Sequence, residues 1–143
     1  MNKGFSLIEL LAVLTIIGIL TSLAYPSYRD YIVRVHRIDG QTALFDLANR
    51  MERYYHDKHS YQSATIATGQ RSDLLDKNIS TGGWYLLSIV QANQNSYLLK
   101  ATPIGSQANT DTLCQSLTLN HLGNKSTYPG PAGDPTGLPS QSW

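Results

Sequence analysis

The chain has 143 residues with eleven basic and ten acidic side chains, which gives a formal net charge of +1. Charged residues make up 15% of the sequence, below the roughly 25% of an average soluble protein. This balance excludes a bulk electrostatic attraction for nucleic acid. The length leaves room for one small globular domain besides an apolar anchor.

Residues 5–25 form an almost wholly apolar run. At about 1.5 Å per helical residue this run spans the hydrocarbon core of a bilayer, which is roughly 30 Å thick. A secretory signal peptide has a shorter apolar core and ends at a small-residue cleavage site, whereas this run continues into Pro26. The run therefore predicts a membrane-spanning helix that stays in the mature protein. Pro26 is expected either to kink the helix or to end it.

Glu9 lies inside the apolar run. A charged side chain in the bilayer interior costs about 2.5 to 3.5 kcal/mol. One explanation is structural, because a carboxylate in the first helical turn is favoured by the helix dipole and can reach the interface. The other explanation is functional, namely that the carboxylate pairs with a positive charge in the assembled state. The residue alone leaves both explanations open.

The segment Gly4-Phe5-Ser6-Leu7-Ile8-Glu9 follows Met1, Asn2 and Lys3 and opens the apolar helix. This arrangement resembles the processing site and N-terminus of type IV pilins and pseudopilins. The resemblance implies that a prepilin peptidase cuts between Gly4 and Phe5 and methylates the new amine of Phe5. It also implies that Glu9 pairs with the Phe5 amine of a neighbouring subunit, because a buried pair costs much less than a buried lone charge.

The resemblance also implies the domain plan and the location of the chain. Residues 1–4 are the expected leader peptide, 5–25 the transmembrane and filament-core helix, and 26–143 an extracytoplasmic pilin domain. The chain is expected to cross the inner membrane once, with its globular part in the periplasm, and then to join a pilus at the cell surface. Expected partners are other pilin subunits, the prepilin peptidase, the inner-membrane assembly platform and the membrane itself.

Beyond Pro26 the pattern becomes amphipathic. The apolar residues Ile38, Leu44, Leu47, Met51 and Tyr54 or Tyr55 recur at helical steps and predict one buried stripe on a helix that ends at about Lys58. The spacing of Asp46 and Arg50 favours an i,i+4 ion pair. A local group of basic side chains is interpreted as a solvated stretch beside lipid head groups. Its members are Arg29, Arg34, His36 and Arg37.

The second half of the chain predicts a small antiparallel sheet. Strands are expected at 84–91, 96–102, 113–120 and 125–127, with a turn of asparagines at 93–95. One helical turn is expected at 72–75, and no regular structure in the Pro- and Gly-rich tail from 128 to 142, whose end Trp143 is expected to fix. The fold class is α+β: a long N-terminal helix, half transmembrane and half amphipathic, packed on three to four strands, as in the pilin fold.

The order Trp84-Tyr85-Leu86-Leu87, then Tyr97-Leu98-Leu99, then Cys114 is similar to minor pilins of the type IV pilus. Such pilins close a C-terminal loop with a disulfide, but Cys114 is the only cysteine here and Ser142 precedes the terminal Trp143. The hypothesis is that Ser142 occupies the place of the missing partner and leaves Cys114 as a free, buried thiol. Intermolecular pairing of Cys114 is the alternative.

The sequence contains no nucleophile elbow, P-loop, zinc-protease motif or dinucleotide fingerprint. We therefore expect a structural protein without catalytic residues, cofactor or metal, and interpret His56 and His59 as surface residues. A pseudopilin of a type II secretion system and a membrane-anchored binding module that never polymerises are the alternatives. Adhesion, twitching motility and DNA uptake all stay open, and contact with nucleic acid is expected only through the pilus.

Overall fold

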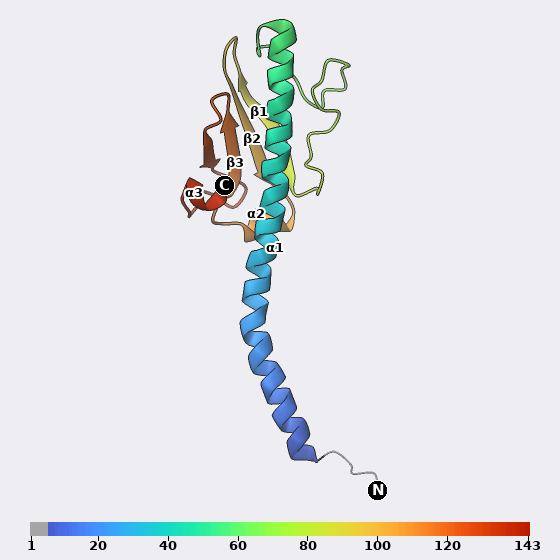
Figure 1. Ribbon diagram of the computed structural model, residues 1–143, viewed down its shortest axis with the longest axis vertical. Helices are drawn as coiled ribbons and strands as arrows, with labels where there is room; N and C mark the ends of the chain where they lie inside the picture. The colour runs from blue at the N-terminus through green and yellow to red at the C-terminus, as the bar shows by residue number, and fades with distance from the viewer. Residues whose placement is uncertain (1–5) are drawn as a thin grey trace. The chain divides into compact units, whose positions relative to one another are not determined.

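A computed structural model of the protein describes residues 6–143, so the predictions for Gly4 and Phe5 lie outside the described residues. The elements are α1 (Leu7–Lys58), β1 (Tyr85–Ala92), β2 (Tyr97–Pro103), α2 (Ser106–Thr110), β3 (Ser116–Asn120), β4 (Lys125–Tyr128) and α3 (Pro139–Ser142) (Figure 1). The chain divides into two compact units, one ending at Arg34 and the other running from Val35 to Trp143. Each unit is described by itself.

The first unit contains the N-terminal part of α1. This helix is long and apolar enough to cross a membrane, and none of its most apolar window is buried. Three hydroxyl groups within the apolar run donate hydrogen bonds to backbone carbonyls one turn earlier, at 2.7 to 2.8 Å; they belong to Thr15, Thr21 and Ser22. Because these donors are satisfied within the helix, they are compatible with a hydrocarbon environment. The alternative that the helix ends at Pro26 is wrong, since α1 continues through it.

The second unit begins with the remainder of α1, which ends at Lys58 as predicted. Its buried residues are Arg37, Gly40, Leu44, Leu47 and Met51. The prediction that Ile38 faces the core is wrong, because its side chain is 58% exposed. Arg37 lies in the buried stripe instead, and its charge is paired with the buried carboxylate of Asp111.

The four strands form one antiparallel sheet in the order β1-β2-β3-β4, which confirms the predicted α+β class. Leu87 in β1 lies opposite Ala101 in β2, and Ala101 lies opposite Leu117 in β3. Side chains on one face of the sheet join the buried residues of α1 in a single core; they are Tyr85, Leu87, Tyr97, Leu99, Ala101, Leu117 and Leu119. The backbone at Gly40 lies so close to this face that an added Cβ would come within 2.8 Å of the Tyr85 ring.

Several predicted boundaries are wrong. Strands β1 and β2 each lie one residue later than expected, and β3 begins at Ser116 rather than at residue 113. The residues before β3 form a turn in which Gln115 N donates to Asp111 O at 3.1 Å, and Gln115 has a positive φ of 48°. No helix forms at 72–75, whereas the unpredicted short helices α2 and α3 occur at 106–110 and at 139–142 in the tail.

Candidate functional site: an exposed apolar helix and a buried polar network

Glu9 lies in the first turn of α1, among exposed apolar side chains. Its Oε2 accepts a hydrogen bond from the backbone N–H of Ser6 at 3.2 Å. A carboxylate that accepts from an otherwise unpaired N–H at a helix N-terminus is stabilised by that bond and by the helix dipole. The described residues thus give Glu9 a local structural contact. The predicted pairing with the Phe5 amine lies outside them and stays a prediction.

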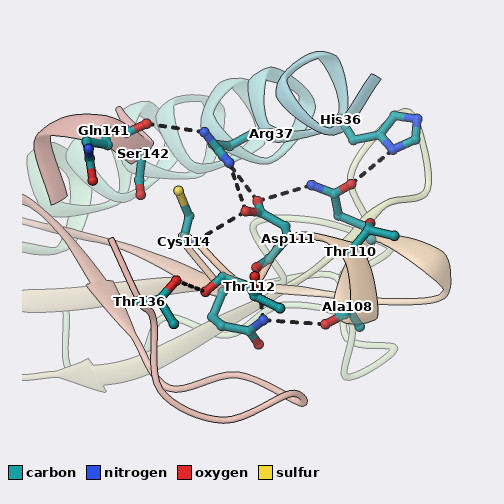
Figure 2. A network of polar contacts seen from close by, with 12 residues as sticks. His36, Arg37, Ala108, Thr110, Asp111, Thr112, Cys114, Thr136, Gln141 and Ser142 are labelled. Atoms are coloured by element: carbon teal, nitrogen blue, oxygen red, sulfur yellow. Dashed lines mark hydrogen bonds and ion pairs between the residues drawn. The ribbon is translucent and has the colours of Figure 1, made fainter. Parts of the chain in front are cut away.

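Arg37 and Asp111 form a buried ion pair within the second unit (Figure 2). Arg37 Nη2 lies 2.8 Å from Asp111 Oδ1, and Arg37 Nε lies 3.1 Å from Asp111 Oδ2. The two side chains are 8% and 0% exposed. Because the guanidinium matches the carboxylate with two parallel hydrogen bonds, the pair offsets much of the cost of taking two charges out of water. The pair fixes α1 to the turn that follows α2.

The remaining lone pairs of Asp111 are used by its neighbours. Gln107 Nε2 and the Tyr85 hydroxyl donate to Oδ2 at 3.2 and 3.4 Å, and the backbone N–H of Cys114 donates to Oδ1 at 3.2 Å. Burial lowers the pKa of Arg37. The hydrogen bond to Asp111 and the negative charge of that carboxylate raise the pKa by more than burial lowers it, so the net shift is upward. Arg37 therefore remains a cation, and the network is a fully paired scaffold rather than a proton-transfer site.

The same face of α1 holds the C-terminal segment. Arg37 Nη1 donates to the carbonyl of Gln141 at 3.2 Å, and Gln41 Nε2 donates to that of Ser142 at 2.7 Å. These carbonyls lie at the end of α3, and the last backbone carbonyls of a helix have no hydrogen-bond partner within the helix. Trp143 Nε1 donates to Ser126 O in β4 at 3.0 Å. The end of the tail is therefore fixed at several points, as expected for Trp143.

Cys114 and Ser142 lie together beside this network (Figure 2), and they are 0% and 1% exposed. Burial raises the pKa of the Cys114 thiol, and the neighbouring Ser142 hydroxyl partly counteracts that shift. Within residues 6–143, the buried Ser142 Oγ has no hydrogen bond that meets ordinary geometric limits. This proximity is what the hypothesis of a lost disulfide partner requires, and the state of Cys114 stays a prediction.

His36 and Arg37 correct the interpretation of the basic group as a solvated stretch. Arg37 is buried, and the half-buried His36 ring stacks on Trp84 with a centroid separation of 3.7 Å. His36 Nδ1 lies 3.1 Å from Gln107 Oε1, so this nitrogen carries the proton in the favoured tautomer. A sequence signal was available, because position 37 continues the helical spacing of the buried positions 40, 44, 47 and 51. No comparable signal marks Asp111 as its partner.

The other predicted positions are exposed. Arg50 Nε lies 2.9 Å from Asp46 Oδ2, which confirms the predicted i,i+4 pair. His56 and His59 lie at the surface near the end of α1, and His56 Nδ1 is 3.3 Å from Asp57 Oδ1. Within residues 6–143, no group of three or more His, Cys, Asp or Glu side chains is arranged to hold a metal ion.

Comparisons with known proteins point to one family. The family described as type IV minor pilin ComP, DNA uptake sequence receptor, matches residues 26–118, and the prokaryotic N-terminal methylation motif matches residues 1–25. Fimbrial protein EcpC of Eikenella corrodens is 30% identical over 124 residues, which cover 83% of this chain and 76% of EcpC. Type IV major fimbrial protein FimA of Dichelobacter nodosus (strain VCS1703A) is 31% identical over 103 residues, which cover 72% of this chain and 60% of FimA.

Among solved structures, the non-core minor pilin PilV of Neisseria meningitidis matches with a TM-score of 0.53 and 19% identity over 75% of this chain and 97% of PilV. This likeness shows the fold, and it agrees with a long helix packed on a four-stranded sheet. The predicted family and fold are therefore confirmed. The chain belongs to the type IV minor pilins and is a membrane-anchored pilus subunit with an N-terminal methylation motif.

Proposed function

We propose that this minor pilin is made as a prepilin, cut between Gly4 and Phe5, and methylated on Phe5 by a prepilin peptidase. Residues 5–25 anchor it in the inner membrane, and residues 26–143 lie in the periplasm until the assembly platform transfers the subunit to the pilus. The match of the methylation motif to residues 1–25 and the unburied apolar part of α1 support this sequence of events. In this role the chain is structural and catalyses no reaction.

The observation that carries the assembly proposal is the position of Glu9, the only acidic residue between Leu7 and Tyr25. In the single subunit its carboxylate accepts from Ser6 N. In the filament, we propose, it accepts from the methylated amine of Phe5 in a neighbouring subunit. An axial register that leaves the carboxylate unpaired in apolar surroundings costs about 2.5 to 3.5 kcal/mol, so one register is selected.

Replacing Glu9 tests this proposal in cells that assemble pili. Glu9→Leu and the uncharged, similarly shaped Glu9→Gln are each expected to leave the chain in the membrane fraction and to remove it from sheared pili. Thr21→Leu is the matched control, because it also replaces a polar side chain in the apolar run, and it should enter pili normally. Normal amounts of either Glu9 variant in sheared pili would contradict the proposal.

A second candidate function is contact with DNA, because the family that matches residues 26–118 is described as a DNA uptake sequence receptor. Two lysines lie beside aromatic rings in the described part of the chain. Lys100 Nζ is 5.5 Å from the ring centroid of Tyr128, which is 53% exposed, and Lys125 Nζ is 5.0 and 5.3 Å from those of Phe45 and Trp143. Such pairs can contact the phosphates and bases of nucleic acids. A site built around Lys100 neutralises few phosphates, so we expect a shallow dependence of affinity on salt.

Fluorescence anisotropy with a labelled DNA duplex tests this candidate on the full chain in detergent. Lys100→Gln is expected to weaken binding severalfold, whereas Lys77→Gln, an exposed lysine in the loop before β1, should leave binding unchanged. The candidate is wrong if no binding is detected at physiological salt, or if both variants weaken it equally.

A further inference from the structure

An open groove of about 270 Å³ lies between the last turns of α1 and the long loop that follows. Its lining residues are Arg50, Arg53, Tyr54, Asp57, Asp73 and Leu74. All of them belong to the second unit, and neither the assembly of the pilus nor the proposed contact with DNA uses them. The groove is therefore a separate place where the displayed domain can hold a ligand.

The loop wall of the groove is held in shape by Asp73. Its carboxylate accepts four hydrogen bonds, from the Thr65 hydroxyl at 2.6 Å, from the Thr68 hydroxyl and backbone N–H at 2.7 Å each, and from Gln70 N at 3.1 Å. These bonds lower the pKa of Asp73 to about 2. The carboxylate is thus used inside the loop, so it is not an acceptor for a ligand, and the wall is formed before any ligand arrives.

The helix wall is joined to the loop by Arg50. Its Nε pairs with Asp46, and its Nη1 donates to the carbonyl of Leu74 at 2.9 Å. This arginine is therefore already neutralised by a partner on its own helix. Arg53, three residues further along α1, makes no hydrogen bond or ion pair with any described part of the chain. Its guanidinium offers five N–H donors in a planar fork.

Tyr54 supplies the other free group in the groove. Its ring is half-buried against the core, and within residues 6–143 its hydroxyl has no hydrogen-bond partner. The remaining carboxylate of the lining, Asp57, is 75% exposed, and its Oδ1 lies 3.3 Å from His56 Nδ1. The groove therefore combines the guanidinium of Arg53 and the hydroxyl and ring of Tyr54 with one exposed carboxylate that can accept hydrogen bonds. This set complements a small ring that carries a carboxylate, hydroxyl groups that can donate to Asp57, and one apolar face.

We propose that this groove binds one acidic sugar unit of a polysaccharide, with the sugar carboxylate on the Arg53 fork and a C–H face of the ring against Tyr54. The volume is slightly below the roughly 300 to 1,000 Å³ of pockets for drug-sized ligands, which suits a single sugar ring. The open side lets the rest of the polysaccharide continue into solvent. The contact is weak for one subunit and is strengthened where subunits repeat along a pilus.

The test titrates the full chain in detergent micelles with a trimer of galacturonic acid, followed by calorimetry and by saturation-transfer NMR. Galactose trimer, which lacks the carboxylate, is expected to bind at least tenfold more weakly, and inorganic sulfate should not displace the uronate at equal concentration. Absence of uronate binding overturns the proposal. Equal competition by sulfate overturns it as well, because it shows that any small anion suffices.

Variants locate the site. Arg53→Gln is expected to weaken uronate binding at least tenfold, and Tyr54→Phe is expected to weaken it less because the ring remains. Arg71→Gln is the matched control, since Arg71 is an exposed arginine of the same loop outside the lining. Circular dichroism of each variant checks the fold. Equal losses in Arg53→Gln and Arg71→Gln contradict the assignment, whereas incorporation into pili should be unchanged in both.

Discussion

The two parts of α1 are stabilised in opposite ways. Up to Arg34 the helix exposes nearly every apolar side chain, and the hydroxyl groups of Thr15, Thr21 and Ser22 donate to its own backbone carbonyls. From Val35 onward the helix buries a stripe that includes a charge, and its polar contacts reach residues more than 70 positions away. The first part therefore depends on lipid or on neighbouring subunits, whereas the second is stabilised within its own domain.

The largest expected effect comes from breaking the buried pair. Arg37→Ala leaves the Asp111 carboxylate buried without its cation, which should cost about 3 to 5 kcal/mol of unfolding free energy. The exposed Arg34→Ala should change stability by at most about 0.5 kcal/mol. Chemical denaturation followed by tryptophan fluorescence measures both. Equal stabilities of the two variants would show that the pair does not hold the domain together.

Ser142→Cys is expected to stabilise the same domain. Cys114 and Ser142 are buried side by side, so oxidation should join the two cysteines and restrict the unfolded chain, which adds about 2 to 4 kcal/mol. Intact mass with and without alkylation reports the bridge, and thermal unfolding with and without reductant reports the gain. If both thiols remain alkylatable after oxidation, the two side chains do not face each other as described.

Two glycines of α1 sharpen the comparison between its parts. Gly40→Ala places a Cβ about 2.8 Å from the Tyr85 ring, and the overpacking cost of about 1 to 3 kcal/mol should exceed the gain in helix propensity. At Gly18 nothing in the chain lies within 4 Å of an added Cβ. Gly18→Ala should therefore leave the unfolding of the domain unchanged. A stabilised Gly40→Ala variant in thermal denaturation would contradict the close packing of helix and sheet.

The smallest expected effect is a pH response of the loop around Asp73. Its folded pKa, about 2, lies below the ordinary value of 3.8, so the loop is stabilised at neutral pH and loses that stabilisation as pH falls from about 4 to about 2. The amide resonance of Thr68 should shift in this window. Asp73→Asn should remove the shift, and a variant that titrates like the parent would exclude Asp73 as the cause.

The sequence predicts the structure best where buried residues recur at a regular spacing. The apolar run and the end of α1 at Lys58 follow from spacing alone. Prediction fails where a side chain pairs with a residue far along the chain. The sequence favours a solvated Arg37, because its partner Asp111 lies 74 residues away. The start of β3 was misplaced for the same reason, since the Asp111 carboxylate organises the turn through Cys114 N.

Some of the site residues can also be predicted from the sequence, and others cannot. A carboxylate in an apolar run is anomalous and marks Glu9, and a single cysteine cannot form a bridge within the chain, which marks Cys114. Arg53 and Tyr54 carry no such anomaly, since an arginine and a tyrosine near the end of an amphipathic helix are ordinary. They became a candidate site only when the structure placed the Asp73 loop opposite them.

Mass spectrometry of sheared, purified pili tests the central claim most directly. If the chain is a processed pilus subunit, its N-terminal peptide in pili begins at Phe5 with a methylated amine, and none begins at Met1. Gly4→Leu should abolish that peptide and leave the uncut chain in the membrane. Absence of the chain from purified pili, or its presence there with residues 1–4 intact, would contradict the account.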